Sequence, residues 1–137
     1  MKGTCLSFRQ PWGTLAVLGL KPIDNRPWST EYRGRLFIHT SAAKKLYFPR
    51  PFSDRWIADR LDQAGRDLYY TTPRPRGAII GEADLVDCVQ ESASPWFVGP
   101  FGLVLANPKR YDKPIPYTGA LKLYEIELEG EPICSTN

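Results

Sequence analysis

Short stretches in which apolar and polar residues alternate recur along this chain and predict a β-sheet. The clearest covers residues 121–129, Leu-Lys-Leu-Tyr-Glu-Ile-Glu-Leu-Glu, which gives a strand with one apolar and one charged face. Further strands or extended segments are expected at 4–8, 23–26, 35–40, 77–89 and 101–105. Gly81 lies inside the longest of these and indicates a bend or bulge. Residues 107–119 hold three prolines and are expected to form a loop.

Helical signals are short and scattered between the strands. Pro11 suits a first helical position, since its φ is fixed and it has no amide to satisfy, so a helix should cover 12–18 and stop at Gly19. Ser41 can cap a short helix over 42–44. Ser53 can cap a longer helix whose apolar face is formed by Ile57, Leu61, Ala64 and Leu68.

Five or six strands with two or three helices place the chain in the α+β class, mostly β. The expected architecture is a small, mostly antiparallel β-barrel decorated by helices. The length of 137 residues predicts a single domain over 1–137. Thirteen prolines argue against a helical bundle, because proline interrupts helices.

Composition and motifs indicate the cellular compartment of the protein and whether a metal or cofactor is expected. No apolar run approaches the ~20 residues of a membrane span, and the first residues lack the apolar core of a signal peptide, so a cytoplasmic protein without membrane contact is expected. The cysteines, Cys5, Cys88 and Cys134, are odd in number and far apart, which fits a reduced compartment. Their spacing does not match that of zinc ligands, so no metal is expected. The sequence also contains no phosphate-binding loop and no dinucleotide-binding motif, so no cofactor is expected.

Charge is unevenly distributed along the chain. Residues 1–80 carry fourteen Lys and Arg against six Asp and Glu, whereas residues 81–137 carry four against nine. A basic half suggests an anionic partner such as nucleic acid. The alternative is that the halves fold together and the charges only solvate the surface.

The densest polar and aromatic region spans residues 7–28. Lys21, Asp24 and Arg26 supply a cation, a carboxylate and a planar donor fork, while Trp12 and Trp28 can stack on bases. In an extended segment Asp24 and Arg26 share one face. A lysine near an aspartate can also serve acid–base chemistry if burial shifts its pKa. The alternative is a structural ion pair.

Other candidate residues lie outside this region. His39 is the only histidine and sits beside Ser41 at a strand end, so it is either a site residue or a structural histidine. Trp96 lies in an aromatic loop that either walls a base pocket or plugs one mouth of the barrel.

Taken together, these segments resemble the ASCH domain family. The resemblance rests on residues 6–12 (Leu-Ser-Phe-Arg-Gln-Pro-Trp), on Gly19-Leu20-Lys21 followed by Asp24-Asn25-Arg26 and Trp28, and on Tyr32-Arg33-Gly34 with Ile38-His39. Residues 77–81, 94–97 and 102–108 also look like the family, so the resemblance covers about residues 4–128. It implies a PUA-like fold, a small β-barrel with a helix over a cleft, and RNA or other nucleic acid bound in that cleft.

The resemblance also implies a second activity. Some relatives are N4-acetylcytidine amidohydrolases that use the lysine matched by Lys21 and a threonine nucleophile three residues later; nuclease activity has been suggested for others. Here that threonine position is Asp24, so the amidohydrolase mechanism does not carry over directly. An aspartate can still activate a water.

Two main hypotheses follow, with a protein- or metabolite-binding module as a third. The first is binding of RNA or a modified nucleotide, with DNA also open, through the ligand-binding candidates Gln10, Trp12, Lys21, Arg26, Trp28, His39, Ser41 and Trp96. The second is a small hydrolase acting on N4-acylated cytidine or on RNA, with Lys21 and Asp24 as catalytic residues.

Overall fold

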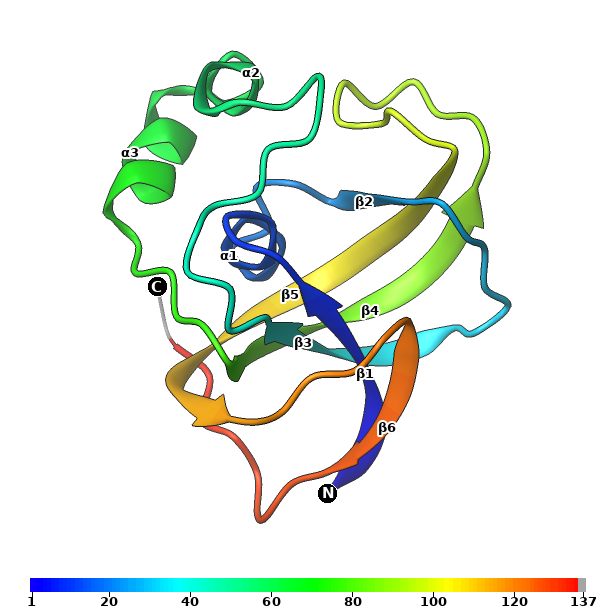
Figure 1. Ribbon diagram of the computed structural model, residues 1–137, viewed down its shortest axis with the longest axis vertical. Coiled ribbons are helices and arrows are strands. Elements are labelled where there is room, and N and C mark those ends of the chain that lie inside the picture. The colour runs from blue at the N-terminus through cyan, green and yellow to red at the C-terminus, as the bar shows by residue number, and fades with distance from the viewer. Residues whose placement is uncertain (136–137) are drawn as a thin grey trace.

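A computed structural model describes residues 1–135 (Figure 1). The elements are β1 (Lys2–Phe8), α1 (Trp12–Val17), β2 (Ile23–Arg26), β3 (Gly34–Thr40), α2 (Asp54–Ala58), α3 (Gln63–Thr71), β4 (Ala78–Val89), β5 (Phe101–Pro116) and β6 (Leu123–Glu127). The chain is therefore mostly β, in agreement with the predicted class. None of the helices in residues 1–135 is long and apolar enough to cross a membrane.

The six strands form one sheet in the order β2-β5-β4-β3-β1-β6. Only β1 and β3 run parallel; the other pairings are antiparallel, as the sequence predicts. The predicted closed barrel is wrong, because within residues 1–135 no pairing joins the edge strands β2 and β6. These edge strands have only four and five residues.

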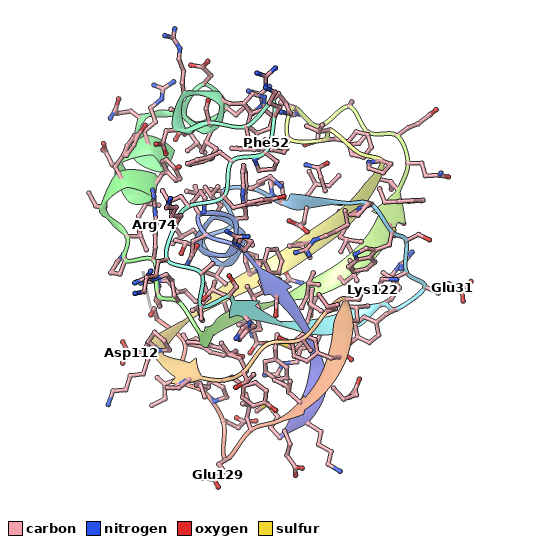
Figure 2. All side chains as sticks on the ribbon, viewed as in Figure 1. Glu31, Phe52, Arg74, Asp112, Lys122 and Glu129 are labelled. Atoms are coloured by element: carbon pink, nitrogen blue, oxygen red, sulfur yellow. The ribbon has the colours of Figure 1, made fainter. Side chains whose placement is uncertain are left out.

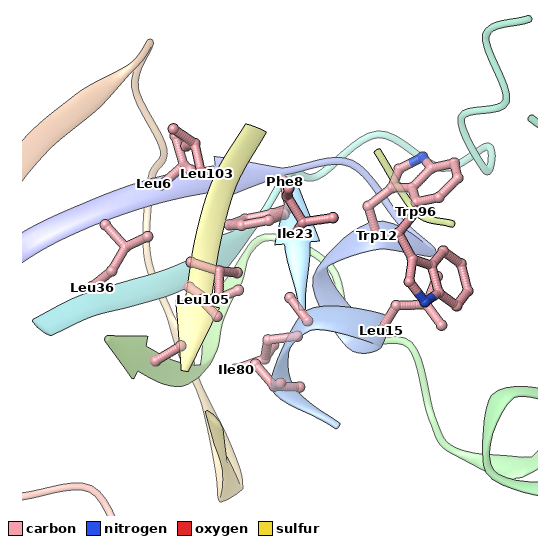
Figure 3. Close-up of a cluster of buried hydrophobic side chains, with 14 of the residues drawn as sticks. Leu6, Phe8, Trp12, Leu15, Ile23, Leu36, Ile80, Trp96, Leu103 and Leu105 are labelled. Atoms are coloured by element: carbon pink, nitrogen blue, oxygen red, sulfur yellow. The ribbon is translucent and has the colours of Figure 1, made fainter. Parts of the chain in front are cut away.

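The two faces of the sheet bury separate apolar clusters. The larger cluster lies between the sheet and the helices and includes Leu6, Leu36, Ile38 and Leu103, shown in part in Figure 3. Their neighbours Cys5 and Phe37 point to the other face and pack with Ile126. This division follows from the alternation of side chains along a strand.

Helix α1 lies directly on the sheet, and all six of its residues are buried. Gly13 permits this close approach, since a Cβ there would lie 2.4 Å from Cγ2 of Thr40. The helix ends before Gly19, which has φ +73°, a conformation that favours glycine. The start of α1 is thereby fixed next to the end of β1, where the candidate site lies.

The predicted helices after Ser41 and Ser53 need correction. Residues 42–44 form no helix, although Ser41 Oγ accepts a hydrogen bond from the Ala43 amide. Ser53 does cap α2, but that helix stops at Ala58. A second helix, α3, follows, and its first turn is capped by the Asp62 side chain, which accepts a hydrogen bond from Gly65 N at 2.8 Å. The break shifts the buried face, so Gly65 and Tyr69 are buried instead of Ala64 and Leu68.

The predicted loop at 107–119 is also wrong for most of its length, because β5 continues to Pro116. Asn107 has φ +51°, and the register between β4 and β5 shifts at three places, so the strand bends without ending. One shift lies between Ile79 and Gly81, where the sequence predicts a bulge. The loop is confined to residues 117–122, which cross over the end of β1.

Candidate nucleic-acid interface

A pocket of about 280 Å³, here called the base pocket, opens where β1, α1 and β2 meet. Its fourth side is the segment between β3 and α2, which runs alongside this corner because Tyr47 N donates to Gln10 O at 2.8 Å (Figure 1). The pocket is lined by Ser7, Arg9, Trp12, Lys21, Asp24, Asn25, Arg26, Pro27, Tyr47, Pro49 and Phe52. Trp12, Lys21, Asp24 and Arg26, which the sequence places in one polar and aromatic region, thus line one pocket.

Strand β2 supplies the charged pair of the pocket. Asp24 and Arg26 lie on one face, and Arg26 Nε donates to Asp24 Oδ2 at 2.6 Å. A terminal nitrogen of Arg26 donates to Ser7 O at 3.0 Å, and the guanidinium lies 5.0 Å from the Phe8 ring. Two of its five N–H groups are thus used by residues 1–135, and three remain for a ligand.

Asn25 points to the opposite side of β2 and holds the loop before β5. Its Oδ1 accepts from Val98 N at 2.8 Å and Gly99 N at 2.9 Å, and its Nδ2 donates to Trp96 O at 3.0 Å. These bonds attach the 94–99 loop to the strand that carries Asp24 and Arg26.

Lys21 is the most unusual charged group of the site, because its side chain is 4% exposed. Its Nζ donates to Ile23 O at 2.5 Å and lies 5.3 Å from the centre of the Trp12 ring. Burial lowers the Lys21 pKa below its ordinary value; the Asp24 carboxylate opposes this shift, and Arg26 adds to it. An ammonium has three donors and Ile23 O takes one, so Lys21 can meet an acceptor in the pocket.

Aromatic rings form the wall opposite the charged strand. The Trp12 indole donates from Nε1 to Tyr47 O at 2.7 Å, which fixes the plane of its ring. Phe52 packs edge-on against Trp12 with centroids 4.8 Å apart; Figure 2 labels it on the segment before α2. The Arg9 guanidinium lies 4.6 Å from the Tyr47 ring. Rings on one side and polar groups on the other suit a flat aromatic ligand with a polar edge.

A second cavity of about 500 Å³, here called the phosphate pocket, adjoins the base pocket and shares Ser7, Arg9 and Arg26 with it. Lys122 from the 117–122 loop adds a third cation, and no carboxylate is among the lining residues. Arg26 is paired with Asp24, but Arg9 and Lys122 form no ion pair within residues 1–135, so the cavity carries a net positive charge that is suited to an anion.

His39 and Ser41 belong to this second cavity and not to the base pocket. His39 is buried; its Nε2 lies 2.7 Å from Tyr117 O, and its Nδ1 lies 2.9 Å from Ser7 Oγ. A carbonyl can only accept, so Nε2 carries the proton and Nδ1 accepts from Ser7. Burial lowers the His39 pKa, which keeps the ring neutral at pH 7. The histidine thereby ties the 117–122 loop to the sheet.

The remaining predicted residues lie near the base pocket but do not line it. Gln10 is buried and donates to Thr14 Oγ1 and Pro75 O, each at 2.9 Å, which stabilises the start of α1. Trp28 lies 5.9 Å from the Arg26 guanidinium. Trp96 is 5% exposed and packs against Trp56, in the same buried cluster as Trp12 (Figure 3).

Seven lining residues were not among the predicted site residues: Ser7, Arg9, Asn25, Pro27, Tyr47, Pro49 and Phe52. Three of them come from residues 44–53, Lys-Lys-Leu-Tyr-Phe-Pro-Arg-Pro-Phe-Ser, where basic and aromatic residues are interleaved. That composition could have indicated a nucleic-acid site in this segment, but it does not indicate which strand end the segment covers. Within residues 1–135, no group of three or more potential metal ligands gathers at the site or elsewhere.

Comparison with known proteins agrees with the resemblance. The sequence model of the ASCH domain matches residues 6–115. Two curated relatives are named Activating signal cointegrator 1: the chain is 33% identical to the one from Homo sapiens and 32% identical to the one from Mus musculus. Each alignment covers 91% of this chain and 22% of the relative, so the chain spans about a fifth of the length of these relatives.

Proposed function

Because the chain belongs to the ASCH domain family, we propose that it binds RNA or a modified nucleotide, with one unpaired base in the base pocket. The observation that carries this proposal is the contact between two different pockets. One is walled by rings and holds Lys21 and Arg26; the other is lined by cations without a carboxylate. A nucleotide has the same division into an aromatic base and an anionic phosphate.

The base pocket fits the base by its size and its two walls. A volume of about 280 Å³ lies at the lower end of small-molecule sites, which suits one base and excludes a base pair. Trp12 and Phe52 supply ring surface, on which stacking contributes ~1–3 kcal/mol per base. Lys21 and Arg26 supply donors for acceptor atoms on the base edge.

The phosphate pocket fits the adjoining backbone. Arg9 and Arg26 border both pockets, so a base and its own phosphate can be bound together. Arg9 and Lys122 are exposed and form no ion pair within residues 1–135, so a phosphate need not displace a carboxylate from them. The same chemistry would accept DNA, and the RNA and DNA arms of the experiment decide between them.

The test measures fluorescence anisotropy of a labelled, unstructured tetranucleotide of mixed sequence, as RNA and as DNA. The Arg9→Gln/Lys122→Gln variant removes two cations of the phosphate pocket without breaking an ion pair of residues 1–135. Its affinity should fall about tenfold at 0.1 M salt, and the slope of log K against log salt should flatten by about 1.4. The Lys2→Gln/Lys109→Gln variant removes two exposed charges that line neither pocket and should behave as wild type. Equal losses in both variants would refute the assignment.

A second candidate is a hydrolase acting on N4-acylated cytidine or on RNA. It is favoured by the burial of Lys21 and its lowered pKa, which bring an amine closer to a neutral general base. Against it, Lys21 donates to Ile23 O and Asp24 is held by Arg26. Nucleoside mass spectrometry on acylated cytidines and RNA, before and after incubation, should show deacylation or shortened RNA that is absent with Lys21→Ala. Unchanged substrates would eliminate this candidate and leave binding.

A further inference from the structure

The groove does not end at the phosphate pocket. A third cavity of about 810 Å³ shares His39, Ala42 and Gly119 with it. A fourth cavity of about 430 Å³ shares Ala42 with the third and is lined otherwise by Lys44, Arg74, Pro75 and Arg76. Since each cavity shares lining residues with the next, the four lie in a row past Ala42 and the 117–122 loop, and this row of adjoining cavities is here called the groove.

The far end of this groove is strongly basic. Lys44, Arg74 and Arg76, here called the basic exit, form no ion pair within residues 1–135. Arg74 is held in place, because it donates to Tyr69 O at 2.8 Å and its guanidinium lies 4.4 Å from the Tyr69 ring. Figure 2 places Arg74 and Lys122 on opposite sides of the view, with α1 and the end of β1 between them. The groove therefore has cations on both sides of its third cavity.

The middle of the groove differs from its ends. The third cavity is lined by neutral residues: His39, Ala42, Gly77, Pro116, Tyr117, Thr118 and Gly119. Along all four cavities the only lining carboxylate is Asp24, which Arg26 neutralises. A small metabolite or a free nucleotide would need only the first two cavities. Two sets of basic residues with a neutral cavity between them are suited to a polyanion long enough to reach both sets.

We propose that the groove holds a single strand of nucleic acid, running from the base pocket through the phosphate pocket to the basic exit. This inference rests on the proposed function and specifies its ligand as an oligonucleotide with unpaired bases, not a mononucleotide or a duplex. Base insertion orients the strand, because the base pocket admits one base only. Phosphates several nucleotides away then reach Lys44, Arg74 and Arg76, which contribute affinity without sequence preference.

The experiment compares short and long probes of one mixed sequence, a dinucleotide and an unstructured dodecanucleotide, each as fluorescein-labelled RNA and DNA. The exit variant is Lys44→Gln/Arg74→Gln/Arg76→Gln. The matched control, Lys2→Gln/Lys109→Gln/Lys113→Gln, removes the same charge from exposed residues that form no ion pair within residues 1–135 and line none of the four cavities. Because Arg74 contacts Tyr69, the double variant Lys44→Gln/Arg76→Gln is measured as well.

Wild type should bind the dodecamer at least tenfold tighter than the dinucleotide. The exit variant should lose at least tenfold in dodecamer affinity, change by less than twofold with the dinucleotide, and flatten the salt slope by about 2, since each single-strand phosphate contact contributes about 0.7. The double variant should flatten it by about 1.4, and the control should match wild type.

The inference is overturned if the dodecamer binds no tighter than the dinucleotide, or if exit and control variants lose affinity equally. It is also overturned if a polyglutamate peptide of equal charge displaces the dodecamer as well as unlabelled RNA does, because the exit would then be a general polyanion surface. In these cases dinucleotide binding, and with it the proposed function, survives. Wild type that binds neither probe would overturn both.

Discussion

Replacing Lys21 with methionine should stabilise the protein while weakening ligand binding. Lys21 is 4% exposed, and a buried ammonium loses hydration worth several kcal/mol. Against that loss stand one hydrogen bond to Ile23 O, about 1 kcal/mol, and the contact with the Trp12 ring, about 1 kcal/mol; the attraction of Asp24 is opposed by the repulsion of Arg26. Methionine has a similar length and removes the hydration loss without opening a cavity. The Asp24–Arg26 pair remains intact.

The expected gain for Lys21→Met is about 1–2 kcal/mol in the free energy of unfolding at pH 7. For a chain of 137 residues, this corresponds to a rise in Tm of about 3 °C per kcal/mol. Urea titration and thermal scans followed by circular dichroism measure both quantities. The tetranucleotide anisotropy assay should show at least a tenfold loss of affinity in the same variant.

The advantage of Lys21→Met should also depend on pH. The folded-state pKa of Lys21 lies below the ordinary 10.5. Burying the charged side chain therefore lowers the free energy of unfolding at every pH at which Lys21 is protonated in both the folded and the unfolded state. As the pH rises through the folded pKa towards 10.5, wild-type Lys21 becomes neutral on folding and this cost disappears. The stability difference should therefore shrink with rising pH. A variant less stable than wild type by more than 1 kcal/mol at pH 7, or a difference constant with pH, would refute the reasoning.

Three further predictions concern the surroundings of the site. Asn25→Ala removes three hydrogen bonds to the 94–99 loop and should lower the free energy of unfolding in urea by about 1–3 kcal/mol. Amide exchange at Val98 and Gly99 should become faster, and unchanged exchange would contradict this prediction. Glu82→Ala removes the acceptor of Arg35 and of the buried Tyr111 hydroxyl and should cost about 1–2 kcal/mol; a variant as stable as wild type would show that water replaces these bonds. Burial raises the Cys5 pKa to about 11, so iodoacetamide at pH 8 should alkylate Cys88 and Cys134 first; mass spectrometry showing early Cys5 labelling would contradict it.

Local sequence patterns predict the positions of most strands, but they do not predict how far β5 extends or whether the sheet closes. Alternation located β6 and the middle of β4, and apolar-rich runs located β1 and β3, which are buried on both faces of the sheet. It could not predict that β5 passes three prolines, since its bends depend on register shifts against β4, a long-range property. It also could not show that the sheet stays open, because closure depends on whether β2 and β6, which are far apart in sequence, pair with each other.

The site was predictable where its residues are close in sequence. Lys21, Asp24 and Arg26 fall within six residues, and strand geometry alone places the last two on one face. Tyr47 and Phe52 join the pocket through a segment without regular structure, held by the hydrogen bond from Tyr47 N to Gln10 O. Nothing in residues 41–53 encodes that contact. For Trp96 the sequence offered a base-pocket wall or a buried plug; the structure buries the ring, but its partner Trp56 is distant in sequence and was not predicted.

The most direct test of the central claim follows the four tryptophan indole N–H signals of ¹⁵N-labelled protein during titration with the mixed-sequence RNA tetranucleotide. Trp12 lines the base pocket, whereas Trp56 and Trp96 do not, although Trp56 packs edge-on against the lining residue Phe52 with centroids 4.8 Å apart. A base inserted beside Lys21 should therefore shift the Trp12 signal most, the Trp56 signal less and the Trp96 signal least. A Trp12 signal that stays still at saturating RNA, or larger shifts at Trp56 and Trp96, would contradict the account.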